Sequence, residues 1–192
     1  AFINNNEIWI VNVDGSELKQ LTSDGTVKTR LQWVPPDFTD IVFITGKCVK
    51  MVNADTTQVN IITCFDTAAY LEDFKISPDA SKVAISIDHE QIYIVPFNLE
   101  ALKQAKSRKD LAPMGECKYF SPYAPVLAKT LAWSRDGKAL AYVFEAPVGG
   151  RREDNIREIL VADCVDPQVR IGVDFPAKFF VIKGYNVSPA IQ

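Results

Sequence analysis

An all-β fold built from repeated antiparallel units is predicted by two features of the sequence. Apolar and polar residues alternate in short runs that end in turn residues, as in EIWIVNVDG at residues 7–15. Such runs are typical of strands joined by tight turns. The chain also matches itself at a fixed spacing, which is the signature of a repeat architecture.

The clearest repeat has a spacing of 41 residues. Residues 1–23 align without a gap on residues 42–64, with apolar residues on apolar residues. The turn residue Asp14 falls on Asp55. Each copy predicts a hairpin preceded by the end of another strand. Because an isolated hairpin is barely stable in water, we expect each hairpin to belong to a larger sheet.

A second motif recurs beside these hairpins. It consists of an apolar segment, a short turn with Asp, and an alternating strand. Its copies lie at residues 31–45, 74–88 and 131–144, with Trp33, Ile76 and Trp133 in equivalent places. Together the two motifs predict four short strands in each unit of about 42 residues, the arrangement of a β-propeller blade. A blade buries its faces by stacking on its neighbours.

We therefore predict a partial β-propeller of about three and a half to four blades. The expected organisation is one domain over residues 1–192, with units at approximately 1–23, 31–65, 74–112 and 131–175 and an insertion at 98–128. Within the insertion, the spacing of apolar residues predicts a short helix at 99–107. The first unit starts within its second strand. Because open strand edges favour aggregation, we expect them to be completed by the rest of the chain or by another chain.

Both motifs resemble the PD40 repeat of TolB-like β-propellers. The matching residues are Trp9, Asp14, Gly15, Leu21 and Thr22 in the hairpin motif, and Ser77, Pro78, Asp79, Lys82, Trp133, Ser134, Asp136, Gly137 and Lys138 in the other motif. The segment WVPPDFTD of the second unit lacks the Ser and the Gly of the pattern. The resemblance implies an exported bacterial protein that contacts other proteins, located in the periplasm, outside the cell or at its surface.

The composition of the chain limits the classes of function that it can have. The 192 residues carry a net charge of about −3 with mixed signs, and 47% are hydrophobic. No basic stripe favours a nucleic-acid partner, and the apolar runs are too short for a membrane-spanning helix. The single histidine, His89, and the absence of a CxxC pair argue against an ordinary zinc site. We expect no metal and no cofactor.

The hairpin register predicts one disulfide. Cys48 and Cys64 start and end a hairpin whose facing residues have numbers that add to about 111 or 112. They are expected to face one another closely enough to be bridged. Cys117 and Cys164 are the candidates for a second bridge, while four buried free thiols are the alternative. Disulfides would indicate an oxidising compartment outside the cytoplasm.

Other candidate sites have simpler structural explanations. The aspartates of the turns could be calcium ligands, but they lie one per turn, so we expect them to stabilise the turns themselves: Asp14, Asp55, Asp79 and Asp136. His89 is interpreted as a loop residue. The segment VGGRRED at 148–154 lacks the context of a phosphate-binding loop and is interpreted as a solvated hairpin loop.

Aromatic residues fall into two groups. Trp33 and Trp133 occupy equivalent places in their units, which predicts packing between blades. Tyr119, Phe120 and Tyr123 lie in the insertion, outside the repeat. An exposed aromatic cluster suits a protein interface; the alternative is that the cluster folds back over the propeller edge.

No combination of nucleophile, base and orienting group is found, so we predict no catalytic residues. The leading interpretation is a non-catalytic protein-binding or scaffold module of an exported protein. The alternative implied by the resemblance is the substrate-gating propeller of a prolyl-oligopeptidase or dipeptidyl-peptidase type serine peptidase, with its catalytic domain outside this chain. A small-molecule lyase or dehydrogenase propeller would require histidine or acidic clusters, which a single histidine disfavours.

Overall fold

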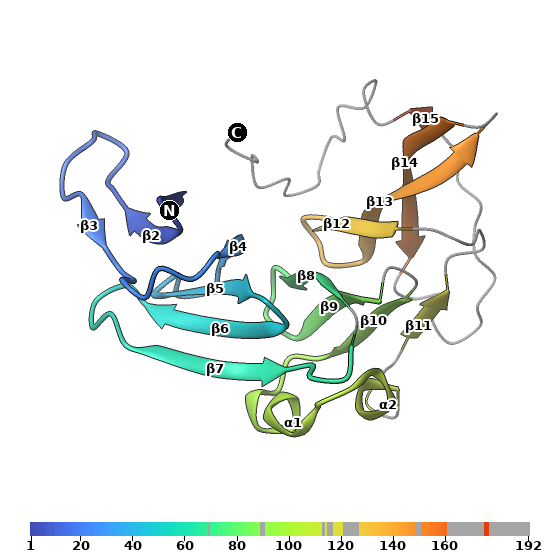
Figure 1. Cartoon of the computed structure of the whole chain (residues 1–192), viewed down its shortest axis with the longest axis horizontal. Coiled ribbons are helices and arrows are strands. Elements are labelled where there is room, and N and C mark those ends of the chain that lie inside the picture. Colours follow the sequence, from blue (N-terminus) through green and yellow to red (C-terminus); the bar gives the residue numbers. More distant parts are fainter. Residues whose placement is uncertain are drawn as a thin grey trace.

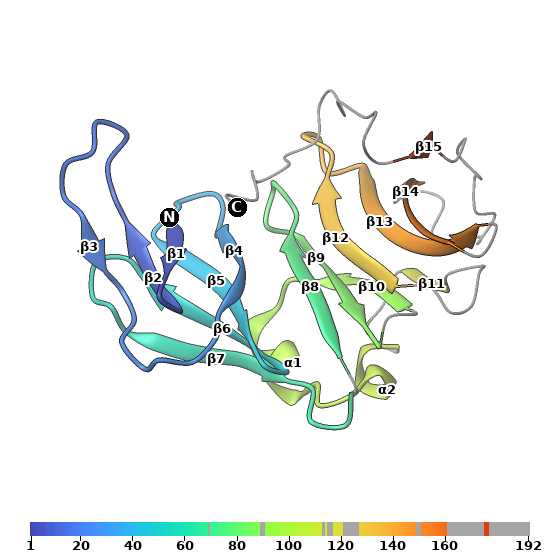
Figure 2. The same ribbon diagram turned by 45° about the horizontal axis from the view of Figure 1, so that its top comes forward.

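The computed structural model describes residues 1–160, except 69, 89–90, 113, 115–116, 121–126 and 149–150, and the short strand at 175–176. Within this part of the chain, four antiparallel sheets follow one another in chain order along an arc (Figure 1, Figure 2). Neighbouring strands of each sheet are also consecutive in the sequence. This is the expected blade topology of an all-β partial propeller.

The first sheet has three strands and the second has four. The strands of the first sheet are β1 (Phe2–Asn4), β2 (Glu7–Ile10) and β3 (Lys19–Gln20). Those of the second are β4 (Thr29–Trp33), β5 (Asp40–Thr45), β6 (Cys48–Asn53) and β7 (Val59–Cys64).

The third and fourth sheets each have four strands. The third contains β8 (Leu71–Ile76), β9 (Lys82–Ile87), β10 (Gln91–Pro96) and β11 (Cys117–Phe120). The fourth contains β12 (Leu127–Trp133), β13 (Ala139–Val148), β14 (Arg151–Leu160) and β15 (Phe175–Pro176). Two short helices, α1 (Leu99–Gln104) and α2 (Arg108–Leu111), lie between β10 and β11 in the chain.

The strand register reproduces the 41-residue repeat. Trp9 of β2 faces Gln20 of β3, and in the second sheet Lys50 of β6 faces Ile61 of β7, each number being larger by 41. The pairing of β1 with β2 likewise recurs between β5 and β6. The spacing seen in the sequence is therefore the spacing of equivalent strand pairs.

The predicted insertion requires a correction. Strand β11 pairs with β10 and forms the outer strand of the third sheet, although it lies within the range 98–128 that was expected to be outside the repeat. The predicted unit 74–112 therefore ends before its own fourth strand. The inserted part is the helical segment. Helix α1 confirms the expected helix, and α2 is a second, shorter helix that follows it. A four-residue outer strand makes few contacts with its neighbours, so its sequence can depart from the repeat.

Strand β5 shows why the blades bury both of their faces. Ile41 and Phe43 point into a buried cluster shared with the first sheet. Val42 and Ile44, on the opposite face, point into the larger cluster formed with the third sheet and the helices. Successive side chains of a strand alternate between faces. The continuous apolar run IVFI is therefore explained by burial on both sides rather than on one.

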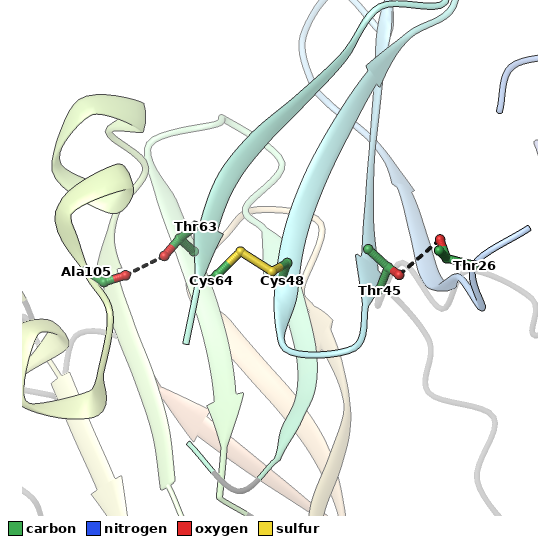
Figure 3. Close-up of a disulfide and its surroundings, with 6 residues drawn as sticks. All are labelled: Thr26, Thr45, Cys48, Thr63, Cys64 and Ala105. Atoms are coloured by element: carbon green, nitrogen blue, oxygen red, sulfur yellow. Dashed lines mark hydrogen bonds between the residues drawn. A yellow bond between two sulfur atoms is a disulfide. The ribbon is translucent and has the colours of Figure 1, made fainter. Parts of the chain in front are cut away.

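Helix α1 covers part of the outer edge of the second sheet. The side chains of Leu102 and Leu111 are fully buried in the larger cluster. Thr63 of β7 donates a hydrogen bond from its hydroxyl to the carbonyl oxygen of Ala105, at the end of α1 (Figure 3). Helix α1 thus shields part of the outer edge of β7. Within the described part of the chain, no helix has the length and apolar character needed to cross a membrane.

Candidate functional site

The predicted disulfide between Cys48 and Cys64 is confirmed (Figure 3). The two residues are register partners at the end of the β6–β7 hairpin, with Cα atoms 4.0 Å apart. Both predicted sums of facing residue numbers occur, because Ile62 is an extra residue that shifts the register within the hairpin. The side chain of Cys117 and all of Cys164 lie outside the described residues, so their pairing stays a prediction.

The first sheet has a buried ionic cluster where the second has the disulfide. Glu7 corresponds to Cys48, and its carboxylate accepts a hydrogen bond from the Thr22 hydroxyl at 2.5 Å. The ammonium of Lys28 lies 3.1 Å from the Glu7 carboxylate and also pairs with Asp24, and the Lys28 side chain is fully buried. The ammonium further donates to the carbonyl oxygen of Asn6 at 3.0 Å. This cluster fastens the segment that joins the first sheet to the second.

The electrostatics of the cluster favour its charged form. The hydrogen bond from Thr22, together with the bonds from Gly25 and Lys28, holds the pKa of Glu7 below its ordinary value. The hydrogen bond from Lys28 lowers the pKa of Asp24 more strongly. Both carboxylates are therefore ionised near neutral pH and compensate the buried ammonium. The cluster stabilises the chain rather than offering a free acid or base.

Three of the four turn aspartates, Asp14, Asp79 and Asp136, bond to their own turns, as predicted. Asp14 accepts from the backbone nitrogen and the hydroxyl of Ser16, at 2.9 and 2.6 Å. Similar bonds form in the turns between the first two strands of the third and fourth sheets, from Ser77 and Ser81 to Asp79 and from Ser134 and Lys138 to Asp136. These bonds lower the pKa of all three carboxyls. Among the described residues, no group of three or more potential metal ligands comes together.

The turn at Asp55 uses a different residue. There the side-chain oxygen of Asn53 accepts from the backbone nitrogens of Asp55 and Thr56, at 3.1 and 2.9 Å. Asn and Asp stabilise turns by bonding the backbone two residues on, and here the bonds reach two and three residues on. Asn53 therefore stabilises this turn as Asp14 stabilises the turn of the first hairpin. No bond within the turn is assigned to the carboxylate of Asp55.

Side chains on the first strand of one sheet bond to the first strand of the neighbouring sheet. The amide group of Gln32 on β4 exchanges two hydrogen bonds with the backbone of Ile76 on β8, at 2.8 and 2.9 Å. The indole nitrogen of Trp133 on β12 donates to the carbonyl oxygen of Lys75 at 2.8 Å, and Trp133 is 3% exposed. The predicted packing of Trp133 between blades is confirmed. The first strands of the second, third and fourth sheets, β4, β8 and β12, are thus connected through side chains and not by strand pairing.

A buried aspartate makes another of these connections. Asp73 on β8 is fully buried, and its carboxylate accepts from the backbone nitrogen of Leu131 on β12 at 2.7 Å. Arg30 on β4 donates to the carbonyl oxygen of Glu72 at 3.1 Å. Arg30 and Asp73 hold the same place in their units, three residues before Trp33 and Ile76. The sequence analysis missed both, although a charged residue at a fixed place in an apolar strand was the available signal.

A groove lies between the first two sheets. It has a volume of about 440 Å³. Its lining comes from the β2–β3 hairpin and from the second sheet: Ile10, Val11, Asn12, Glu17, Leu18 and Lys19, with Trp33, Ala54 and Asp55. The hairpin lies beside the second sheet in both views (Figure 1, Figure 2). Leu18 is 60% exposed and Val11 is 38% exposed, so the apolar part of the groove is open to solvent.

Polar contacts hold the two walls of the groove in place. The ammonium of Lys19 donates to the carbonyl oxygens of Ala54 and Asp55, at 2.7 and 2.8 Å, and so bridges the hairpin to the second sheet. The amide of Asn12 donates to Glu17 within the hairpin at 3.1 Å. The exposed apolar side chains therefore stand on a fixed framework. The sequence analysis treated this hairpin only as strands and a turn, although Val11, Val13 and Leu18 beside the Asp-Gly turn were a usable signal.

Several predicted residues cannot be placed. Tyr119 and Phe120 belong to β11, but their side chains lie outside the described residues. Tyr123 and His89 also lie outside them, as do the two glycines of VGGRRED. The predicted aromatic interface in 98–128 therefore stays a prediction.

Comparison with known proteins supports the fold. No family model and no curated protein matches the chain. Among solved structures, an oligogalacturonate lyase in complex with manganese matches with a TM-score of 0.53 and 10% identity, over 80% of this chain and 39% of that one. The Cps50 (Swd1) β-propeller domain of Myceliophteria thermophila matches with a TM-score of 0.51 and 11% identity, over 83% of this chain and 47% of that one.

A third match is a chain of the mitotic checkpoint complex, with a TM-score of 0.46 and 17% identity, over 72% of this chain and 37% of that one. The chain thus spans less than half the length of each of these structures. The two matches above a TM-score of 0.5 agree with the sheet topology in giving a β-propeller fold. At such low identity they bear on the fold and not on the function.

Proposed function

We propose that this chain is a non-catalytic, protein-binding β-propeller module, and that a partner protein binds in the groove between the first two sheets. The observation that carries this proposal is the open apolar lining of that groove, above all Leu18 and Val11. Apolar surface that is exposed within a concave, polar-rimmed site is typical of interaction sites. Other large apolar side chains are exposed as well, among them Val27, Phe38 and Ile61, but they do not line this groove.

The polar residues support binding rather than chemistry. Three charged side chains of the described residues are buried: Glu7, Lys28 and Asp73. Each of them bonds one part of the chain to another. A catalytic base or nucleophile needs access to a substrate as well as a partner within the protein. No observation among the described residues favours the alternative of a peptidase propeller.

The same proposal includes an extracytoplasmic location. The disulfide between Cys48 and Cys64 supports it, because disulfides persist in oxidising compartments. The resemblance of the repeat to TolB-like propellers points the same way. The partner is therefore expected among exported or surface proteins.

The test compares Leu18→Asp with a matched control, Ile61→Asp. Ile61 is 54% exposed on the outer strand β7 and lies outside the groove. We expect cross-linking in the source cells, followed by binding assays with the purified candidate partner, to show a partner lost by Leu18→Asp and kept by Ile61→Asp. A partner bound equally by both variants would overturn the assignment of the groove. Thermal unfolding of both variants checks that the fold is unchanged.

A further inference from the structure

We propose that the occupant of the groove is a basic peptide segment, in which an apolar side chain lies against Leu18 and Val11 and flanking Lys or Arg residues face the acidic rim. This inference rests on the proposed function and specifies the chemistry of the partner. It combines two independent observations: the shape and apolar lining of the groove, and the charge of the turns that surround it.

The size of the groove suits a peptide. Its volume of about 440 Å³ falls within the range of roughly 300–1,000 Å³ that ligand sites occupy. Apolar side chains line both walls, with Val11 and Leu18 on the hairpin and Trp33 and Ala54 on the second sheet. A single apolar anchor that inserts between two walls is the usual centre of a protein–peptide contact.

The charge around the groove is strongly asymmetric. The turn segments that adjoin it are residues 11–19, 34–40 and 54–58. The turn 34–40 belongs to this set because the backbone nitrogen of Ala54, in the groove, donates to the carbonyl oxygen of Thr39 at 2.8 Å. Together the three segments contain five carboxylates and one lysine: Asp14, Glu17, Asp37, Asp40 and Asp55, with Lys19.

Lys19 does not cancel the negative charge that a ligand in the groove would meet. Its ammonium already donates to two carbonyl oxygens across the groove, where it serves as a bridge. Glu17 and Asp55 line the groove from opposite walls, so a cationic group between them meets a carboxylate on each side. A carboxylate can accept several hydrogen bonds, and Glu17 uses part of this capacity in its bond with Asn12.

The same field selects against other ligands. An acidic rim repels phosphates, so nucleic acids and anionic lipid surfaces are disfavoured. A guanidinium also stacks well on an indole, and Trp33 in the lining is half-buried and so partly open to contact. Apolar and basic groups spaced along one segment are characteristic of a peptide or an exposed protein loop. Charge complementarity of this kind speeds association and sets specificity.

The test uses selection of random displayed peptides on the full chain. We expect the enriched peptides to combine an apolar residue with net positive charge, to lose binding to Leu18→Asp and to keep binding to Ile61→Asp. Leu18-dependent peptides that are neutral or acidic would overturn this inference and leave the proposed function standing. The absence of any Leu18-dependent peptide would also overturn it, whereas the proposed function is judged separately, by the cross-linked protein partner.

A charge variant makes the test quantitative. With one enriched peptide, synthesised with a fluorescent label, Glu17→Gln combined with Asp55→Asn should weaken binding roughly fivefold at low salt, because two surface charge pairs are lost. The control, Asp66→Asn combined with Glu100→Gln, removes the same charge from exposed residues outside the groove and should leave binding unchanged. The difference between the two should shrink at about 1 M salt, where the Debye length is about 3 Å. Equal weakening by both pairs would overturn a local role for the rim.

Discussion

Glu7 and Cys48 occupy the same place in two successive sheets and fasten the chain there by different chemistry. Glu7 faces Asn4 in the register of the first sheet, and Cys48 faces Thr45 in the second, so each pairing is shifted by 41 residues. In the first sheet the fastening is a carboxylate paired with a buried lysine. In the second sheet it is a disulfide. The repeat therefore keeps the position of one bonded residue, Glu7 or Cys48, while its partner differs: a lysine of the connecting segment in the first sheet and a cysteine of the outer strand in the second.

Replacing the buried lysine should destabilise the fold. Lys28→Met removes the partner of Glu7 and Asp24 and should lower the free energy of unfolding by about 3 kcal/mol, the lower end for a broken buried pair, because Asp24 is half exposed. Denaturant unfolding measures this. The matched control is Lys103→Met, whose pair with Glu100 is exposed and should cost no more than about 0.5 kcal/mol. Equal losses in the two variants would contradict the assigned role of the cluster.

The same cluster should make stability depend on acid pH. The pKa values of Glu7 and Asp24 are lowered in the folded chain from ordinary values of 4.5 and 3.8, so the unfolded chain binds more protons below about pH 5. Their contribution is present above the unfolded pKa values and is lost as pH falls through the folded ones. We expect the free energy of unfolding to decrease on acidification, and less steeply in Lys28→Met. Parallel pH curves for both proteins would show that other carboxyls dominate.

Removing the disulfide should cost stability without changing the topology. The bridge spans 16 residues, and loops of about that length contribute roughly 3 kcal/mol through the entropy of the unfolded chain. Cys48→Ser combined with Cys64→Ser should lower the free energy of unfolding by about that amount. A reductant should then destabilise the natural chain but have little effect on this variant. If the reductant still destabilises the variant strongly, a second bridge, such as Cys117 with Cys164, is present.

The buried aspartate should be needed to hold the third and fourth sheets together. Asp73→Ala leaves the backbone nitrogen of Leu131 without its acceptor, which should cost about 2–3 kcal/mol. Asp73→Asn retains an oxygen that can accept this bond and should recover part of the loss. Hydrogen exchange at the Leu131 amide reports the contact directly. Slow exchange that persists in Asp73→Ala would show that another group satisfies this nitrogen.

Much of the local structure follows from the sequence alone. The alternation of apolar and polar residues determines the strands, and the Asp and Asn residues of the turns determine where the chain reverses. The gapless repeat placed Cys48 opposite Cys64 because strands joined by a short turn keep one register over a few residues. Even the ambiguity in that register has a structural cause, since Ile62 shifts it within the hairpin.

Contacts between distant parts of the chain were decided by the tertiary structure. Asp73 and Leu131 lie 58 residues apart, and their bond depends on how one blade stacks on the next, which no local pattern encodes. The outer strand β11 was not recognised in the sequence, because a helical insertion precedes it and shifts it out of the repeat spacing. The groove has the same origin: Leu18 and Trp33 line it from different blades, so it forms only where the two blades meet. Periodicity along the chain thus determined the blades, while the packing between blades decided which side chains bond one part of the chain to another and which remained exposed in the groove.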